Sequence, residues 1–346
     1  MKKHVHPFRV IVAVSCIGSG IVASLLALIG PIAQESNFFS YYINLAVGPI
    51  SDAFSFLFVF CFAAIFSFLA FSLFANAFYH KRDPHEFFSW DFLKKNIRLL
   101  GRGLGELMLE AGPVILTFVF VSLAMASINP VNATHLIDDR VVEWDRALLN
   151  SYPFISFTNI SWPGWFIRIV AFSFMDLPVF IIAFSLYVFA FQRKIFREMA
   201  AVFCFSLVLM LFLWQIFPVL SPHDRYLDNV YNLPNSPSMN EALKKYEPQP
   251  LIEKFLSEMR ERKNQSLGGT MPTSTLPSAH VAWATLLVYY VWRVKKQLLL
   301  LFFPIAFLST IGTFLFAQHY FVDVPAGIAV MMFAIYLVRF TNRKHK

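Results

Sequence analysis

Two short polar motifs near the C-terminus carry residues that could do chemistry. One is the Pro-Ser-Ala-His run at 277–280, and the other places His319 four residues before Asp323. A histidine is an effective nucleophile when a carboxylate holds its second ring nitrogen in the correct tautomer. The i, i+4 spacing predicts that His319 and Asp323 lie on one face of a helix. His280 would then be available to protonate a leaving oxygen.

Three further residues carry groups that bind anions. Ser278 and the amides after Pro277 stand where a helix is expected to begin, and helix N-termini bind anions. Arg225 and His223 supply positive charge or hydrogen-bond donors suited to a phosphate. Each residue also has an ordinary interpretation, because a loop Arg is usually solvated and a lone interfacial His is usually structural. The joint pattern of the two motifs favours catalysis.

The composition requires a bilayer around these residues. Of the 346 residues, 57% are hydrophobic and 14% are charged, whereas a soluble domain has about 25% charged residues. The mean hydropathy is +0.58. This composition excludes an ordinary soluble enzyme, a disordered chain and a disulfide scaffold. The three cysteines lie in apolar runs and form no CxxC pattern. The net charge of +8 is attributed to cytoplasmic loops, so no nucleic-acid partner is expected.

Apolar runs long enough to cross a bilayer predict an all-α polytopic membrane protein with about eight transmembrane helices. The runs cover 10–32, 53–78, 112–128, 169–191, 200–217, 279–292, 298–316 and 321–338. Every second loop between them is rich in Lys and Arg, and the basic loops of such proteins face the cytoplasm. We therefore expect an integral, multi-pass protein with both termini in the cytoplasm. The two histidine motifs and the segment around Arg225 then lie together on the outer, extracytoplasmic or luminal face.

The expected loops divide the chain into two parts. Residues 1–110 form an N-terminal two-helix extension with a cytoplasmic amphipathic segment at 87–109, which is either an interfacial helix or a solvated connector. Residues 111–346 form a six-helix catalytic core with extracytoplasmic loops at 129–165 and 219–276. A short amphipathic stretch at 251–259 interrupts the second loop. The acidic run from Asp138 to Asp145 is interpreted as a solvated loop face.

The two motifs resemble those of the type 2 phosphatidic acid phosphatase superfamily. The run at 277–280 resembles its P-S-x-H motif, and His319 with Asp323 resembles its H-x-x-x-D motif. The longer string at 319–324 (His-Tyr-Phe-Val-Asp-Val), followed by Gly327, is closest to the inositol phosphorylceramide synthase branch. The resemblance covers roughly residues 169–338, and the first two spans look like an addition to the six-helix core of the family.

The resemblance implies a role for each matching residue. His319 would form a phosphohistidine, Asp323 would orient it, His280 would act as acid and base, and Ser278 would contact phosphate. The phosphatases carry an Arg six residues before the nucleophile, where this chain has Thr313, and span five lacks the Lys of their first motif. The predicted phosphate-binding set is Ser278, Arg225, His223 and Thr313.

The resulting expectation is a membrane lipid phosphatase or phosphotransferase that acts at the outer face, tilted toward transfer to a lipid or sugar hydroxyl. One alternative is a simple lipid phosphate phosphatase of the phosphatidate or undecaprenyl type. Another is a non-catalytic lipid or solute transporter with a degenerate site. No metal and no cofactor is expected, and the partners are a lipid phosphate or phospholipid and the bilayer. The sequence leaves the substrate lipid and the oligomeric state open.

Overall fold

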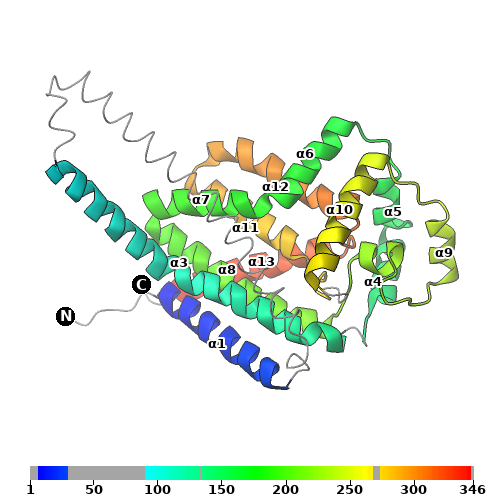
Figure 1. Cartoon of the computed structure of the whole chain (residues 1–346), viewed down its shortest axis with the longest axis horizontal. Helices are drawn as coiled ribbons and strands as arrows, with labels where there is room; N and C mark the ends of the chain where they lie inside the picture. Colours follow the sequence, from blue (N-terminus) through cyan, green and yellow to red (C-terminus); the bar gives the residue numbers. More distant parts are fainter. Residues whose placement is uncertain (1–6, 30–89, 133–134, 268–272, 344–346) are drawn as a thin grey trace.

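The computed structural model describes residues 7–29, 90–132, 135–267 and 273–343 (Figure 1). Over these ranges the chain is helical and has no strand, apart from one isolated parallel bridge between Val219 and Ser274. The all-α expectation is confirmed for the described residues. The second expected span, 53–78, lies outside them.

The described helices follow in chain order. They are α1 (Pro7–Ile29), α3 (Trp90–Asn132), α4 (Asp138–Leu149), α5 (Pro153–Thr158), α6 (Gly164–Met175), α7 (Leu177–Phe191), α8 (Arg193–Ile216), the π-helical turn η3 (His223–Leu227), α9 (Pro237–Leu243), α10 (Pro250–Leu267), α11 (Ala279–Val294), the 3₁₀ turn η4 (Lys296–Leu298), α12 (Leu299–Leu315) and α13 (Asp323–Arg343).

Four described helical segments are long and apolar enough to cross a membrane, and they indicate an integral membrane protein. They are Gly105–Met125 of α3, α8, η4 with α12, and Asp323–Thr341 of α13. The pair α6 and α7 would make a fifth span, bent by 55° at its break. α11, at the sixth expected span, has 16 residues. The count of eight spans, the cytoplasmic termini and the face of the site stay predictions.

The membrane helices share one apolar core. Leu207 and Met210 of α8 lie in it with Leu287 of α11 and Met331 of α13. On the outside of the bundle, Leu300 of α12 is 86% exposed. Extended apolar surface of this kind marks contact with lipid when the helices themselves are membrane spans.

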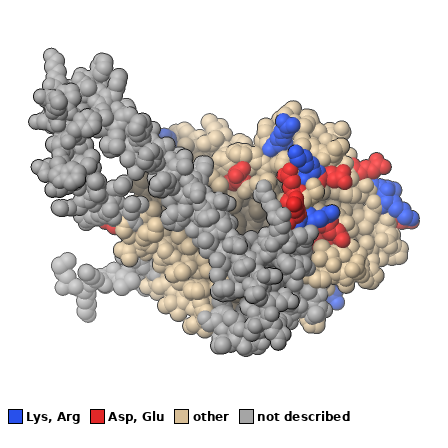
Figure 2. Space-filling model, viewed as in Figure 1, with Lys and Arg blue, Asp and Glu red and all other residues tan. Residues whose placement is uncertain are grey.

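The two expected outer loops are largely helical. α4, α5, α9 and α10 gather at the end of the molecule away from the chain termini (Figure 1). Figure 2 shows that most of the charged side chains visible on this face also lie at that end. The predicted amphipathic stretch at 251–259 falls within α10, whose Ile252 and Leu256 are buried against Ile167 and Val170 of α6. Short helices therefore pack on the bundle within 129–165 and 219–276, and the assignment of these two segments as extracytoplasmic loops stays a prediction.

The N-terminal part of the chain contains one long helix. α3 runs without a break for 43 residues and includes most of the predicted amphipathic segment 87–109 as well as the third expected span. The expected division between residues 110 and 111 lies inside this helix. The two-domain division stays a prediction.

Candidate active site

His319 lies in the turn that connects α12 to α13. The N–H groups of Gln318 and His319 both donate to the carbonyl of Thr313, at 2.8 and 3.1 Å, and Ala317 adopts a positive φ of 47°. Because α13 begins only at Asp323, His319 precedes the helix. The expectation that a helix face brings the two residues together was wrong, since a tight turn does so instead.

The Asp323 carboxylate fixes the orientation of the His319 ring. Its Oδ2 accepts a hydrogen bond from the Tyr320 N–H at 2.9 Å and lies 3.1 Å from Nδ1 of His319. The carbonyl of Thr275 lies 3.2 Å from the same ring nitrogen. Since both neighbours of Nδ1 are oxygens, we assign the proton of the neutral ring to Nδ1. The lone pair is then on Nε2, as a nucleophilic imidazole requires.

Backbone contacts hold the Pro-Ser-x-His motif against the start of α13. Ser278 caps α11, where its Oγ accepts from the N–H of Val281 at 3.3 Å, and its own N–H donates to the carbonyl of Asp323 at 3.3 Å. A Cβ on Gly327 would stand 2.6 Å from the Ser278 carbonyl oxygen, so a larger residue would force the two helices apart. The two histidine motifs are thus joined through main-chain atoms.

His280 is positioned by the break between α6 and α7. Its Nε2 lies 3.1 Å from the carbonyl of Phe174, and its ring stacks on the Phe174 ring with 4.4 Å between centroids. In a continuous helix this carbonyl would accept from residue 178, but Pro178 has no N–H. The carbonyl is therefore available to the histidine. Nε2 donates to it, and Nδ1 is the nitrogen that can exchange a proton with substrate.

We expect Pro178→Ala to lower turnover about tenfold while leaving KM within threefold, because misplacing a catalytic group has effects of this order or larger. The substitution introduces a backbone N–H that competes with His280 for the Phe174 carbonyl. The matched control is Pro304→Ala, which makes the same change inside α12. Steady-state kinetics on a lipid phosphate in detergent micelles would measure both variants. Equal activity of the Pro178 variant and wild type would contradict this role.

The segment around Arg225 lies beside the two histidine motifs. The Thr275 hydroxyl is 3.1 Å from the carbonyls of both Val219 and Leu220, and the Thr275 N–H donates to Val219 at 3.3 Å. The His223 N–H donates to the carbonyl of Ala317 at 2.8 Å. Segments 219–223, 274–280 and 317–323 are therefore in direct contact, although a large span of sequence separates them.

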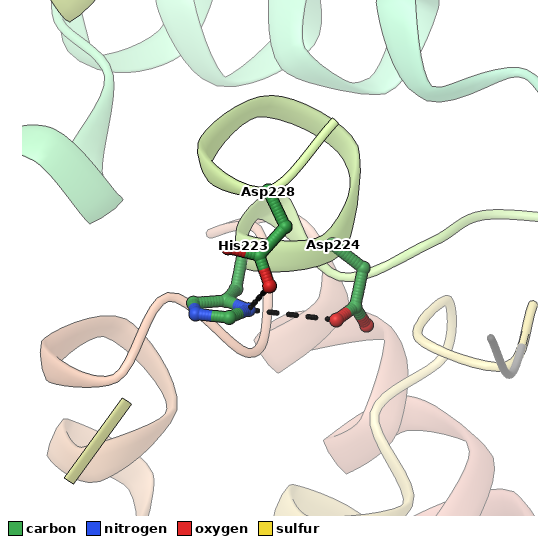
Figure 3. A group of neighbouring side chains, drawn as sticks. All are labelled: His223, Asp224 and Asp228. Carbon is green, nitrogen blue, oxygen red and sulfur yellow. Dashed lines mark hydrogen bonds and ion pairs between the residues drawn. The ribbon is translucent and has the colours of Figure 1, made fainter. Parts of the chain in front are cut away.

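His223 is held by two carboxylates on one side of its ring (Figure 3). Its Nδ1 lies 3.4 Å from oxygens of both Asp224 and Asp228, while Nε2 points away from both carboxylates. That Nε2 is buried and has no hydrogen-bond partner among the described residues. With Nδ1 donating to these carboxylates, Nε2 presents an N–H to an anionic oxygen only when the ring is cationic.

The same three side chains could hold a metal ion. Their ligand atoms lie within 4.8 Å of one another, and within the described part of the chain no other group of this kind is found. Both oxygens of Asp228, however, are already bonded to Arg260, and Oδ2 of Asp224 accepts from the Ser221 hydroxyl at 2.6 Å. A guanidinium at one ligand opposes a second positive charge there. The contacts fit an ion-pair network better than a metal centre.

Two other predicted phosphate ligands are bonded to the protein. Arg225 is 2% exposed and donates to Asp139, to Asn235 and to the Pro234 carbonyl at 2.9–3.0 Å. The Thr313 hydroxyl donates to the Thr310 carbonyl at 2.6 Å, within its own helix. Phosphate binding by Arg225 and Thr313 stays a prediction.

Two of the four carboxylates in the acidic run of α4 are buried, so only part of the run is a solvated face. Asp138 and Asp145 are 1% and 0% exposed. For these two residues the interpretation from sequence was wrong because α4 packs one side against the turn that carries His319. The signal was in the spacing, since Asp138, Val141, Val142 and Asp145 are related by i, i+3, i+4 and i+7 and share one buried face.

Burial raises the pKa of the Asp138 carboxyl to about 7, against hydrogen bonds from Tyr320 and Leu220. It raises the pKa of the Asp145 carboxyl to about 6, against hydrogen bonds from Phe321 and Val322. The folded chain thus binds these protons more tightly than the unfolded chain does, where the pKa of Asp is about 4. Ionising the two groups lowers the stability of the fold as pH rises from about 4 to 7.

A family model described as the PAP2 superfamily matches residues 139–337. The match covers more than half of the chain and contains every predicted site residue. The chain belongs to the PAP2 superfamily, and membership implies phosphatase-type activity on lipid phosphates. A search of curated proteins and a search of solved structures each returned no match.

Proposed function

We propose that this protein transfers the phosphoryl group of a membrane lipid through a phosphohistidine on His319. The carrying observation is the buried contact of Nδ1 of His319 with both Asp323 and the Thr275 carbonyl, which assigns the lone pair to Nε2. The half-buried His280, joined to this pair through Ser278, is the second proton-transfer group. A nucleophile oriented by a carboxylate and accompanied by a separate acid is the arrangement expected for covalent catalysis.

The reaction proceeds in two steps. Nε2 of His319 forms a bond to phosphorus while the bond from phosphorus to the lipid oxygen breaks, and Nδ1 of the cationic His280 ring gives its proton to that oxygen, which leaves His280 neutral. An incoming hydroxyl then gives its proton to His280 and attacks phosphorus as the P–N bond breaks. The charge of Asp323 stabilises the ring of His319 when it becomes cationic.

Ser278 and His223 are the proposed phosphate-binding residues. Ser278 stands at the N-terminus of α11, where free N–H groups favour an anion. The buried Nε2 of His223, which the described residues leave without a partner, donates a hydrogen bond to phosphate when the ring is cationic. These groups take the place of the Lys and Arg found in the motifs of the phosphatases.

The incoming hydroxyl decides the class of reaction. Water makes the protein a lipid phosphate phosphatase, and a lipid or sugar hydroxyl makes it a phosphotransferase. We favour transfer, because the string at 319–324 is closest to the inositol phosphorylceramide synthase branch. The site is proposed to face the extracytoplasmic or luminal side, in a protein with both termini in the cytoplasm.

Purified protein in phospholipid vesicles tests the proposal. We expect release of labelled phosphate from phosphatidate when water is the acceptor. We expect transfer of the inositol phosphate group to ceramide, with release of diacylglycerol, when phosphatidylinositol is supplied together with ceramide. Rapid quenching should trap label on protein in an acid-labile, base-stable form, as a phosphohistidine requires. The proposal fails if no lipid phosphate or phospholipid is turned over, and lipid transport that survives in a His280/His319 double variant would favour a transporter.

A further inference from the structure

α4 contacts two of the three segments that form the site. It lies between α3 and α6 in sequence, but its buried carboxylates bond to residues that follow it by more than 80 positions. Neither motif of the resemblance includes α4.

Asp145 fixes the turn between His319 and Asp323. Its Oδ2 accepts from the N–H of Phe321 at 2.7 Å, and its Oδ1 accepts from the N–H of Val322 at 3.0 Å. These two amides precede α13, where no helical carbonyl is placed to accept from them. A charged acceptor on two adjacent amides restrains the backbone between the nucleophile and its partner.

Asp138 links segment 219–223 to the turn between His319 and Asp323. Its Oδ1 accepts from the N–H of Leu220 at 2.9 Å and from the Tyr320 hydroxyl at 3.1 Å. Tyr320 is fully buried, and it directly follows His319. One oxygen atom therefore joins the segment that leads to His223 to the residue beside the nucleophile.

We propose that Asp138 and Asp145 form a carboxylate clamp that positions the His319–Asp323 pair. The catalytic part of this inference rests on the proposed function, but the positioning part does not. Asp145 contacts the backbone between His319 and Asp323, and Asp138 contacts the side chain of Tyr320. Both are therefore positioning residues. Burying two acidic groups lowers stability, as the pKa values above show, so packing alone does not account for acids at these positions.

Asp145→Asn is the main test, because the amide of Asn keeps one hydrogen-bond acceptor for the N–H groups of Phe321 and Val322 and replaces the other with a donor. Asp145→Ala removes both. Glu143→Gln is the matched control, since it makes the same change on the exposed side of α4, where Glu143 pairs with a half-exposed Arg146. Tyr320→Phe tests Asp138 without leaving a polar group unpaired.

Hydrogen exchange of a peptide covering 317–326 reads the clamp directly and needs no substrate. We expect exchange at residues 321 and 322 to accelerate at least about tenfold in the Asn variant, more in the Ala variant, and not in the Glu143 control. We expect kcat to fall about 10- to 100-fold in the same order, with KM within threefold. The Tyr320 variant should show a smaller loss.

Unchanged exchange in the Asp145 variants would overturn the clamp. So would a loss of activity that only follows the loss of folded protein, measured by the melting temperature. If wild-type protein turns over no lipid phosphate or phospholipid, the proposed function fails, while the exchange data still decide whether α4 fixes the turn.

Discussion

His319→Gln is expected to abolish turnover of lipid phosphates, with a loss of about 10⁴- to 10⁶-fold in kcat. Removal of a nucleophile that forms a covalent intermediate has effects of this size. Gln fills a similar volume and can donate to the Thr275 carbonyl, so the turn before α13 should persist. Release or transfer of labelled phosphate measures the loss, and rapid quenching should find no label on the protein.

The control for this substitution is His135→Gln, which makes the same change at an exposed histidine before α4. It should retain wild-type activity. A His319 variant that keeps a tenth of the activity, or that is still labelled, would show that another residue is the nucleophile.

Asp323→Asn should lower kcat about 10³- to 10⁴-fold with little change in KM, by analogy with the effect of neutralising the carboxylate of a catalytic triad. The oxygen at Oδ2 has two donors, the Tyr320 N–H and Nδ1 of His319. Oδ1 has no hydrogen-bond partner within the described ranges, so an amide fits in shape. What is lost is the charge that stabilises the cationic ring.

The double variant His319→Gln/Asp323→Asn separates a catalytic role of Asp323 from a purely structural one. If the two residues act as one unit, the double variant is no slower than His319→Gln alone. A further loss of activity in the double variant would mean that Asp323 also contributes through a route that does not involve His319.

The pairing of His319 with Asp323 could be predicted from sequence, but its cause could not. Spacing of i, i+4 is satisfied by a helix face and also by a turn closed by a side chain. The turn forms because the N–H groups of Gln318 and His319 donate to the Thr313 carbonyl. No local sequence pattern reveals these hydrogen bonds. Both helices and turns place such residues within reach, so the predicted pairing was correct although the predicted geometry was wrong.

Two other features that position the site, the buried carboxylates of α4 and Pro178, were not predicted because they depend on partners distant in sequence. The acidic run of α4 has the composition of a solvated helix, and Asp138 and Asp145 are buried through contacts with Leu220 and residues 320–322. Pro178 lies inside the fourth expected span, 169–191. Its effect on His280 could not be predicted, because it depends on the end of α6 lying beside the N-terminus of α11.

The short length of α11 bears on how a lipid reaches the site. Sixteen residues rise about 24 Å, about 6 Å less than the hydrocarbon layer of a bilayer. In the proposed orientation, with the C-terminal end of α11 at the cytoplasmic boundary, His280 at the other end lies at a level inside the outer leaflet. The lipid can then react with its acyl chains still among their neighbours, and the alcohol that leaves is already dissolved in the leaflet. Catalysis becomes a surface process, governed by the mole fraction of lipid phosphate within the membrane and not by its concentration in the surrounding water.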